Sequence, residues 1–228
     1  MKNDNPWIIK FGKKEHLEQI LNGKFRFCSL SYYRNYEEEK SEKGTKDIRE
    51  GASEIIYPKT TTSKLEVFGL PNDIFEAESL VCIPKQEKYI ACFSYFTEED
   101  ITKKQIISSM VLKNTNWDSV LLFKNPNDLI AKLSDAVGSM FSYSRIHYYD
   151  DEKQDINELN EFFKPKRFEY QKEFRLSFPM PEKFTDCIEK TDAETCFIHL
   201  KKVDGYIYKT SEFQEKIEKS FFKNEMRK

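Results

Sequence analysis

The order of hydrophobic and polar positions predicts a strand, a helix and a second strand at the start of the chain. Residues 7–11 and 25–29 are short, apolar and β-prone, as in strands that are largely buried. Between them, residues 14–21 carry leucine and isoleucine at helical spacing, and Asn22-Gly23 is a typical helix end. We therefore expect the chain to begin with a strand–helix–strand segment.

Further along, apolar runs alternate with turn signals. Residues 89–96 form a continuous β-prone run, which is typical of a central strand. Asn125 and Pro126 are expected to begin a helix whose apolar positions run from Leu129 to Met140. Other strands are predicted over residues 117–123, 144–149, 197–203 and 206–208, and other helices over residues 155–163 and from residue 210 onward.

The clearest alternation lies in residues 167–178. The even positions are apolar except for Lys172, and all the odd positions are polar. A period of two predicts one strand, with one face in the core and the other directed outward or into a cleft. On that polar face, Gln171 and Glu173 are expected to lie side by side.

The predicted fold class is α+β. No internal repeat, low-complexity stretch or Pro/Gly/Ser-rich linker divides the chain, so residues 1–228 are interpreted as a single mixed domain. The last helix, at about 210–225, is expected to pack on this domain.

Composition narrows the classes of function. The net charge is −2, which excludes a global basic footprint for nucleic acid. The glycines form neither a P-loop nor a GxGxxG motif, and the three histidines lack metal-ligand spacing. Five cysteines without a CxxC pair, and no secretory segment after Met1, predict a cytoplasmic location. No apolar stretch approaches the roughly 18 residues that would span a bilayer, so no membrane partner is expected.

The pair Gln171 and Glu173 is the strongest chemical candidate. A carboxylate beside an amide is suited to binding ribose hydroxyls, and it would stabilise positive charge on the ribose as nicotinamide leaves NAD. The neighbouring amide would orient the accepting nucleophile. The alternative is an ordinary exposed strand whose charged side chains pair with a neighbouring strand.

Residues 171–173 resemble the Gln/Glu-x-Glu motif of ADP-ribosyltransferases, which implies that Glu173 is the catalytic glutamate. Residues 8–21 are similar to the opening strand and helix of DarT-type ADP-ribosyltransferase toxins. Lys10 stands where those toxins usually have a histidine that contacts NAD. Residues 25–33 are similar to the segment that covers nicotinamide in that fold, and residues 91–95 resemble its serine-containing strand. The resemblance implies a split, largely antiparallel β core with flanking helices.

The order of four short motifs also resembles a widespread, poorly characterised bacterial family associated with phage defence. These motifs are Lys10-Phe11, the pair Asp47 and Glu50, Cys92-Phe93-Ser94, and Gln171 through Arg175.

Two sets of binding residues follow from these resemblances and from side-chain chemistry, because guanidinium groups bind phosphate and aromatic rings stack on bases. The expected NAD contacts are Lys10, Phe11, Arg26, Ser29, Tyr32, Tyr33 and Ser94. The expected acceptor contacts are Asp47, Glu50, Arg145, His147 and Arg175. Each has a plainer alternative: core packing for the aromatics, backbone hydrogen bonding for Ser94, a solvated loop for Asp47 and Glu50, and a structural role for His147.

The predicted function is an NAD-dependent ADP-ribosyltransferase toxin that modifies RNA, single-stranded DNA or protein, with NAD as its substrate and no metal. A neutralising antitoxin is a further expected partner. Two alternatives stay open. One is a non-catalytic module that senses a nucleotide or a phage protein, and the other is a nuclease with Asp47, Glu50 and Glu173 around magnesium.

Overall fold

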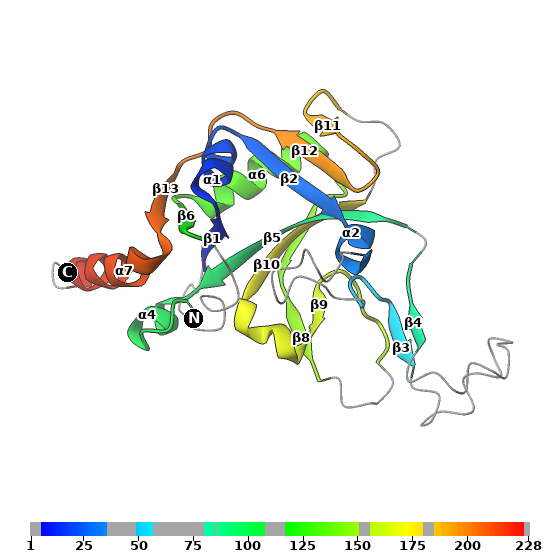
Figure 1. The fold of residues 1–228 in the computed structure, drawn as a ribbon, viewed down its shortest axis with the longest axis horizontal. Helices are drawn as coiled ribbons and strands as arrows, with labels where there is room; N and C mark the ends of the chain where they lie inside the picture. The colour runs from blue at the N-terminus through cyan, green and yellow to red at the C-terminus, as the bar shows by residue number, and fades with distance from the viewer. Residues whose placement is uncertain are drawn as a thin grey trace, which may run out of the picture.

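A nine-stranded sheet forms the centre of the molecule (Figure 1). The computed structural model describes residues 6–35, 49–56, 80–84, 86–107, 117–150, 156–179 and 185–225. The strands of the sheet are β1 (Trp7–Gly12), β2 (Lys24–Ser29), β5 (Lys88–Phe96), β6 (Ser119–Phe123), β7 (Ser142–Arg145), β10 (Glu173–Pro179), β11 (Ile188–Lys190), β12 (Thr195–His199) and β13 (Gly205–Lys209). All their pairings are antiparallel.

The sheet divides along one edge of β5. On one side of β5, the whole of β10 pairs with residues 88–94 of β5, from Glu173 opposite Ser94 to Pro179 opposite Lys88. On the other side, β1 pairs with residues 94–96 and β2 pairs with residues 89–90. In the described part of the chain, residues 91–93 therefore have no strand beside them on this edge. The split leaves backbone groups of β5 open to side chains instead of to another strand.

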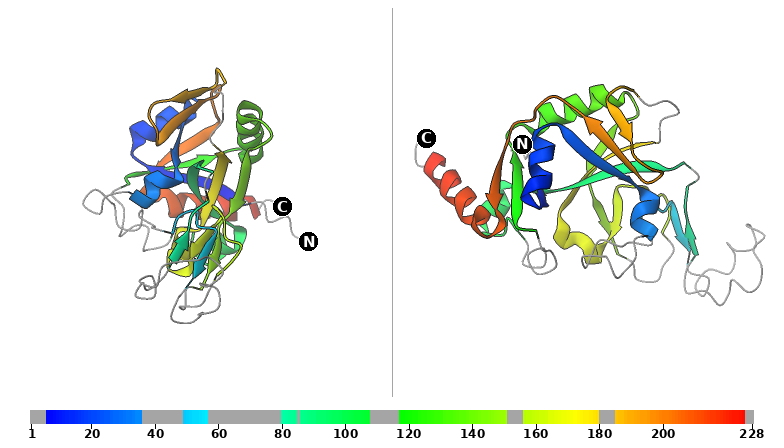
Figure 2. Two further views of the ribbon diagram at one scale, coloured as in Figure 1. Left: turned by 90° about the vertical axis from the view of Figure 1, so that its right-hand side faces the viewer. Right: turned by 45° about the horizontal axis from the view of Figure 1, so that its top comes forward.

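Two small sheets and several helices lie around this sheet. Strands β3 (Glu54–Ile56) and β4 (Leu80–Cys82) are antiparallel, and β8 (His147–Tyr149) and β9 (Phe163–Pro165) are parallel. In Figure 1 both small sheets lie below β5 and β10. The helices are α1 (Lys14–Leu21), α2 (Leu30–Asn35), α4 (Glu98–Thr102), α6 (Pro126–Val137), α7 (Thr210–Glu225) and the 3-10 helix η3 (Lys166–Gln171). Figure 2 shows α1 and α6 close to the β2–β12 part of the sheet and α7 at the far end.

Apolar side chains pack on both faces of the sheet. Because successive side chains of a strand point to opposite faces, Ile8 and Ile9 belong to different clusters. Ile8 packs in the larger cluster, to which α1 contributes Leu17 and α6 contributes Leu129 and Leu133. Ile9 packs in the cluster to which α4 and α7 contribute, with Phe213 of α7 fully buried. The predicted strand over residues 7–11 and the helices over residues 14–21 and from residue 210 are confirmed. The helix after Asn125 is confirmed only as far as Val137, because Met140 lies beyond its end and is exposed.

The turn after α1 requires glycine, as the sequence pattern indicates. Gly23 has a φ of 93°, and a Cβ added there would lie 2.1 Å from the Leu200 carbonyl oxygen. Any side chain would therefore both strain the backbone and collide with the segment that follows β12.

Three predicted elements are wrong. Residues 144–149 are not one strand, because β7 and β8 lie in different sheets. Residues 156–162 are not helical, since the backbone of Ile156 and Leu159 bonds to residues 53–55 instead of to its own preceding turn. Residues 167–178 divide into η3 and β10 at Lys172, which has a φ of 43°.

The polar face of β10 is also not exposed. Strand β10 lies between β5 and β7, and every one of its residues is buried, including Glu173, Arg175 and Ser177. The period of two therefore holds only for the strand residues from Glu173 onward, and both faces of that strand are covered by protein.

The fold class is α+β with a mostly antiparallel sheet, as predicted. No helix in the described ranges has the length and apolar character needed to cross a bilayer.

Candidate functional site

A pocket of about 680 Å³ lies beside the split in the sheet. Its wall includes Lys10 of β1, Arg26 and Cys28 of β2, and Cys92 of β5. The α2 residues Tyr32 and Tyr33 also line it. This volume falls within the range of about 300–1,000 Å³ that is usual for small-molecule sites.

Lys10 reaches across the split. Its ammonium group donates a hydrogen bond to the carbonyl oxygen of Cys92 and lies 5.3 Å from the centre of the Phe93 ring. The side chain is half-buried, and none of the described carboxylates forms an ion pair with it. Burial lowers the pKa of Lys10, and the charge of Arg26 acts in the same direction, while Cys92, Glu173 and Cys28 oppose this.

The pocket lining also includes a second cation and two tyrosine rings. The Arg26 side chain is exposed, and its guanidinium lies 5.5 Å from the centre of the Tyr32 ring. Tyr32 and Tyr33 meet edge to face, with their ring centres 5.3 Å apart. Because α2 begins directly after β2, these two rings are held next to Arg26 by the local chain path.

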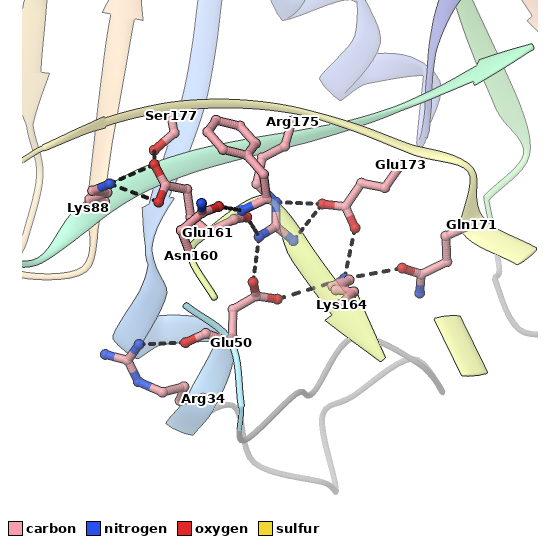
Figure 3. A network of polar contacts seen from close by, with 11 residues as sticks. Arg34, Glu50, Lys88, Asn160, Glu161, Lys164, Gln171, Glu173, Arg175 and Ser177 are labelled. Carbon is pink, nitrogen blue, oxygen red and sulfur yellow. Dashed lines mark hydrogen bonds and ion pairs between the residues drawn. The ribbon is translucent and has the colours of Figure 1, made fainter. Parts of the chain in front are cut away.

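Four buried charged side chains lie on the other side of β5 (Figure 3). We call Glu50, Lys164, Glu173 and Arg175 the charge tetrad; their exposed fractions are 1%, 6%, 4% and 0%. Arg175 donates from Nε to Glu173 Oε1 at 2.8 Å and from Nη1 to Glu50 Oε1 at 2.5 Å. Lys164 Nζ lies 2.8 Å from Glu173 Oε2 and 3.7 Å from Glu50 Oε2. Two cations therefore bridge two carboxylates.

The tetrad fixes the ionisation of its members. Burial alone would raise the pKa of Glu173, but Arg175 and Lys164 hold it well below the ordinary value of 4.5. Burial would lower the pKa of Lys164, yet Glu173 and Glu50 raise it above 10.5. At neutral pH Glu173, Lys164 and Arg175 are therefore charged, and the Glu50 carboxylate contacts both cations.

Further polar contacts extend the tetrad. Glu161 accepts hydrogen bonds from Lys88 Nζ at 2.7 Å and from Ser177 Oγ at 3.2 Å, and its backbone carbonyl accepts from Arg175. Arg34 donates to the Glu50 carbonyl oxygen at 2.8 Å and pairs with Glu87 at 3.3 Å. The network thus ties α2, β5, β10 and the 49–52 segment together.

Cys92 connects the pocket with the tetrad. Cys92 is one of the pocket-lining residues, and its thiol lies close enough to the Glu173 carboxylate to help lower the pKa of that group by hydrogen bonding. Burial, together with the charge of Glu173, raises the pKa of this thiol to about 12. One residue of β5 therefore touches Lys10 through its carbonyl and Glu173 through its thiol.

Five of the seven residues expected to contact NAD line the pocket, namely Lys10, Phe11, Arg26, Tyr32 and Tyr33. Ser29 and Ser94 are not among its lining residues. Ser29 is buried, and its hydroxyl accepts a hydrogen bond from the Tyr32 backbone N–H at 3.1 Å. Ser94 lies directly opposite Glu173 in the sheet.

The expected catalytic pair is brought together, although not by one strand. Gln171 ends η3 and Glu173 begins β10, and Lys164 Nζ contacts both, at 3.2 Å from Gln171 Oε1. Glu173 itself is buried and does not line the pocket; the pocket-lining Cys92 stands next to it.

The expected acceptor contacts are dispersed. Glu50 and Arg175 are tetrad members. Arg145 is in β7, with its guanidinium 4.7 Å from the Tyr95 ring centre, while His147 is in β8 and packs on Phe163. Asp47 lies outside the described residues.

Sequence reasoning missed Lys164 and Glu161. Both come from residues 155–165, which we expected to be a helix and its end. Neither belongs to a recognisable motif, so no local signal could have found them. From their apolar, strand-like surroundings, Cys28 and Cys92 are expected to be small core residues rather than nucleophiles; both line the pocket.

A magnesium site between Glu50 and Glu173 is not supported. The two carboxylates share Arg175 and Lys164, so positive side chains occupy the positions that a cation would take. Within the described ranges, no group of three or more His, Cys, Asp or Glu residues is arranged to hold a metal ion.

Comparisons of the chain with protein-family models, with curated proteins and with solved structures gave no match.

Proposed function

We propose that the pocket binds NAD and that the protein is an ADP-ribosyltransferase with an ADP-ribosyltransferase-like fold. The observation that carries this proposal is the gathering of Lys10, Arg26, Tyr32 and Tyr33 around one pocket beside the split in the sheet. Cations and aromatic rings are the groups that bind a pyrophosphate and stack on nucleotide rings.

Glu173 would supply the negative charge in this reaction. Its carboxylate is ionised at neutral pH and lies against Cys92 at the pocket wall. A fixed carboxylate near the ribose would stabilise the positive charge that develops as the bond to nicotinamide breaks. Gln171, which shares Lys164 with Glu173, would help to place the acceptor. RNA, single-stranded DNA and protein are the proposed acceptors.

A second candidate is a non-catalytic module that binds a nucleotide in the same pocket. One observation favours it: both Glu173 oxygens are occupied, Oε1 by Arg175 and Oε2 by Lys164. A ribose hydroxyl would have to compete with these contacts.

The test uses the full chain with labelled NAD and measures binding, release of nicotinamide and transfer of label to RNA, single-stranded DNA or protein. Arg26→Gln should weaken NAD binding by about tenfold or more, because a hydrogen bond to a charged group contributes about 1.5–3 kcal/mol. Arg167→Gln, at an exposed arginine, is the control.

Glu173→Gln should lower nicotinamide release by about a hundredfold or more, as expected for the loss of a group that stabilises transition-state charge. Glu169→Gln, at an exposed position of η3, should have no effect. Binding without cleavage by the wild type would favour the sensing module, and absence of any nucleotide binding would contradict both candidates.

A further inference from the structure

Lys10 is a half-buried lysine in an unusual environment. Lysine side chains removed from water are normally paired with a carboxylate. The Lys10 amine instead donates a hydrogen bond to the neutral Cys92 carbonyl, and none of the described carboxylates forms an ion pair with it. The apolar face of Phe93 lies below it, and Arg26 is a second cation on the same pocket wall.

A lysine in an apolar pocket beside another cation is the arrangement that turns this side chain into a nucleophile. The uncharged amine is favoured because burial lowers the pKa of Lys10 and because the positive charge of Arg26 adds to that effect. Cys92, Glu173 and Cys28 act in the other direction, but the net shift is downward.

Arg26 also defines the kind of molecule that would react. Its exposed guanidinium stands on the pocket wall and presents the planar donor fork that binds phosphate. We propose that the amine of Lys10 condenses with the carbonyl group of a phosphorylated aldehyde or ketone, whose phosphate Arg26 binds. The inference goes beyond the proposed function because it does not require cleavage of NAD.

The reaction balances without a further reactant. The lone pair of Lys10 Nζ attacks the carbonyl carbon, and the carbonyl oxygen leaves as water with the two hydrogens that the amine loses. A carbon–nitrogen double bond remains. No oxidation or reduction occurs until a hydride donor is added as a trap.

The experiment treats the full chain with glycolaldehyde phosphate and sodium cyanoborohydride at pH 7.5 and measures the reduced adduct on each lysine by peptide mass spectrometry. Lys14 is the internal control, since it lies four residues away and its side chain is 67% exposed. Lys10 should be modified faster than Lys14, because burial lowers the pKa of Lys10 and so increases the fraction of its amine that is uncharged at pH 7.5.

Two comparisons make the result specific. Glycolaldehyde without its phosphate should modify Lys10 more slowly, and Arg26→Gln should remove the advantage of the phosphate. Lys10→Arg should abolish the adduct at position 10 and leave that at Lys14 unchanged. The Lys10 to Lys14 ratio is measured in the wild type, so it does not depend on the folding of any variant.

Equal modification of Lys10 and Lys14 would overturn the proposal, and so would a fast reaction of Lys10 that is indifferent to phosphate. NAD binding is measured separately on the untreated protein. Its failure would contradict the proposed function and leave the lysine chemistry intact.

Discussion

Lys10 and Lys164 lie on opposite sides of β5, and both are at least partly buried, yet their pKa values shift in opposite directions. Lys164 lies between Glu50 and Glu173, and these carboxylates raise its pKa. Lys10 has a carbonyl group and an aromatic ring as neighbours, and its pKa is lowered. The charge tetrad around Lys164 therefore favours charged side chains, whereas the pocket around Lys10 favours an uncharged amine.

The two regions are coupled through Cys92. Because its carbonyl accepts from Lys10 and its thiol contacts Glu173, movement of β5 at this residue would affect both. Within the charge tetrad both carboxylate oxygens of Glu173 have a cationic partner, so in the proposed reaction its position would be set before a ligand enters. Variants that break one region and spare the other can therefore test this division.

The largest effect is expected from Arg175→Met. This change leaves Glu50 and Glu173 buried with one cation fewer, which should lower the free energy of unfolding by about 3–5 kcal/mol. Urea denaturation followed by circular dichroism measures it. Arg167→Met is the matched control at an exposed arginine and should change stability by less than about 1 kcal/mol. An equal loss of stability in both variants would show that the loss does not come from breaking the charge tetrad.

The lysines themselves give the next comparison. Lys164→Met should lower the free energy of unfolding by about 3 kcal/mol, because it leaves the buried Glu173 carboxylate with Arg175 as its remaining cationic partner in the charge tetrad. Lys10→Met should be neutral or stabilising by up to about 1 kcal/mol, because it removes a desolvated cation that has no ion pair among the described residues. Equilibrium unfolding of both variants at pH 7 checks the opposite signs. If Lys10→Met destabilises as much as Lys164→Met, the two regions do not differ as we describe.

The acid limb of the stability curve should show a smaller effect. The folded-state pKa of Glu173 is lowered, so its contribution is fully present above the ordinary value of 4.5 and is lost as the pH falls toward the folded value. A single such carboxylate contributes a slope of up to about 1.4 kcal/mol per pH unit below pH 4.5. Glu173→Gln should show a shallower slope there, whereas Glu169→Gln should follow the wild type. If the stability of Glu173→Gln and of the wild type falls with the same slope below pH 4.5, the pKa of Glu173 is not lowered in the folded protein.

Local sequence pattern was sufficient for much of the sheet and its helices. The strands β1, β2 and β5 and the helices α1, α6 and α7 lie where periodicity and capping residues predict them. These signals are local, because they depend on which side chains share one face and on turn residues such as Gly23. Five of the proposed NAD contacts could also be named in advance, since they lie within β1 and β2 or in the helix directly after β2.

The tertiary structure decided the remainder. Residues 167–178 alternate as a strand would, yet Lys172 takes a left-handed conformation, and only the residues after it pair with β5 and β7 as β10. The charge tetrad joins residues 50, 164, 173 and 175 from three separate segments. The period of two places Glu173 and Arg175 on one face, but no periodicity relates them to residues 50 and 164. The ion pairs with those residues, the burial of all four side chains and the opposite pKa shifts of Lys10 and Lys164 therefore depend on the folded chain.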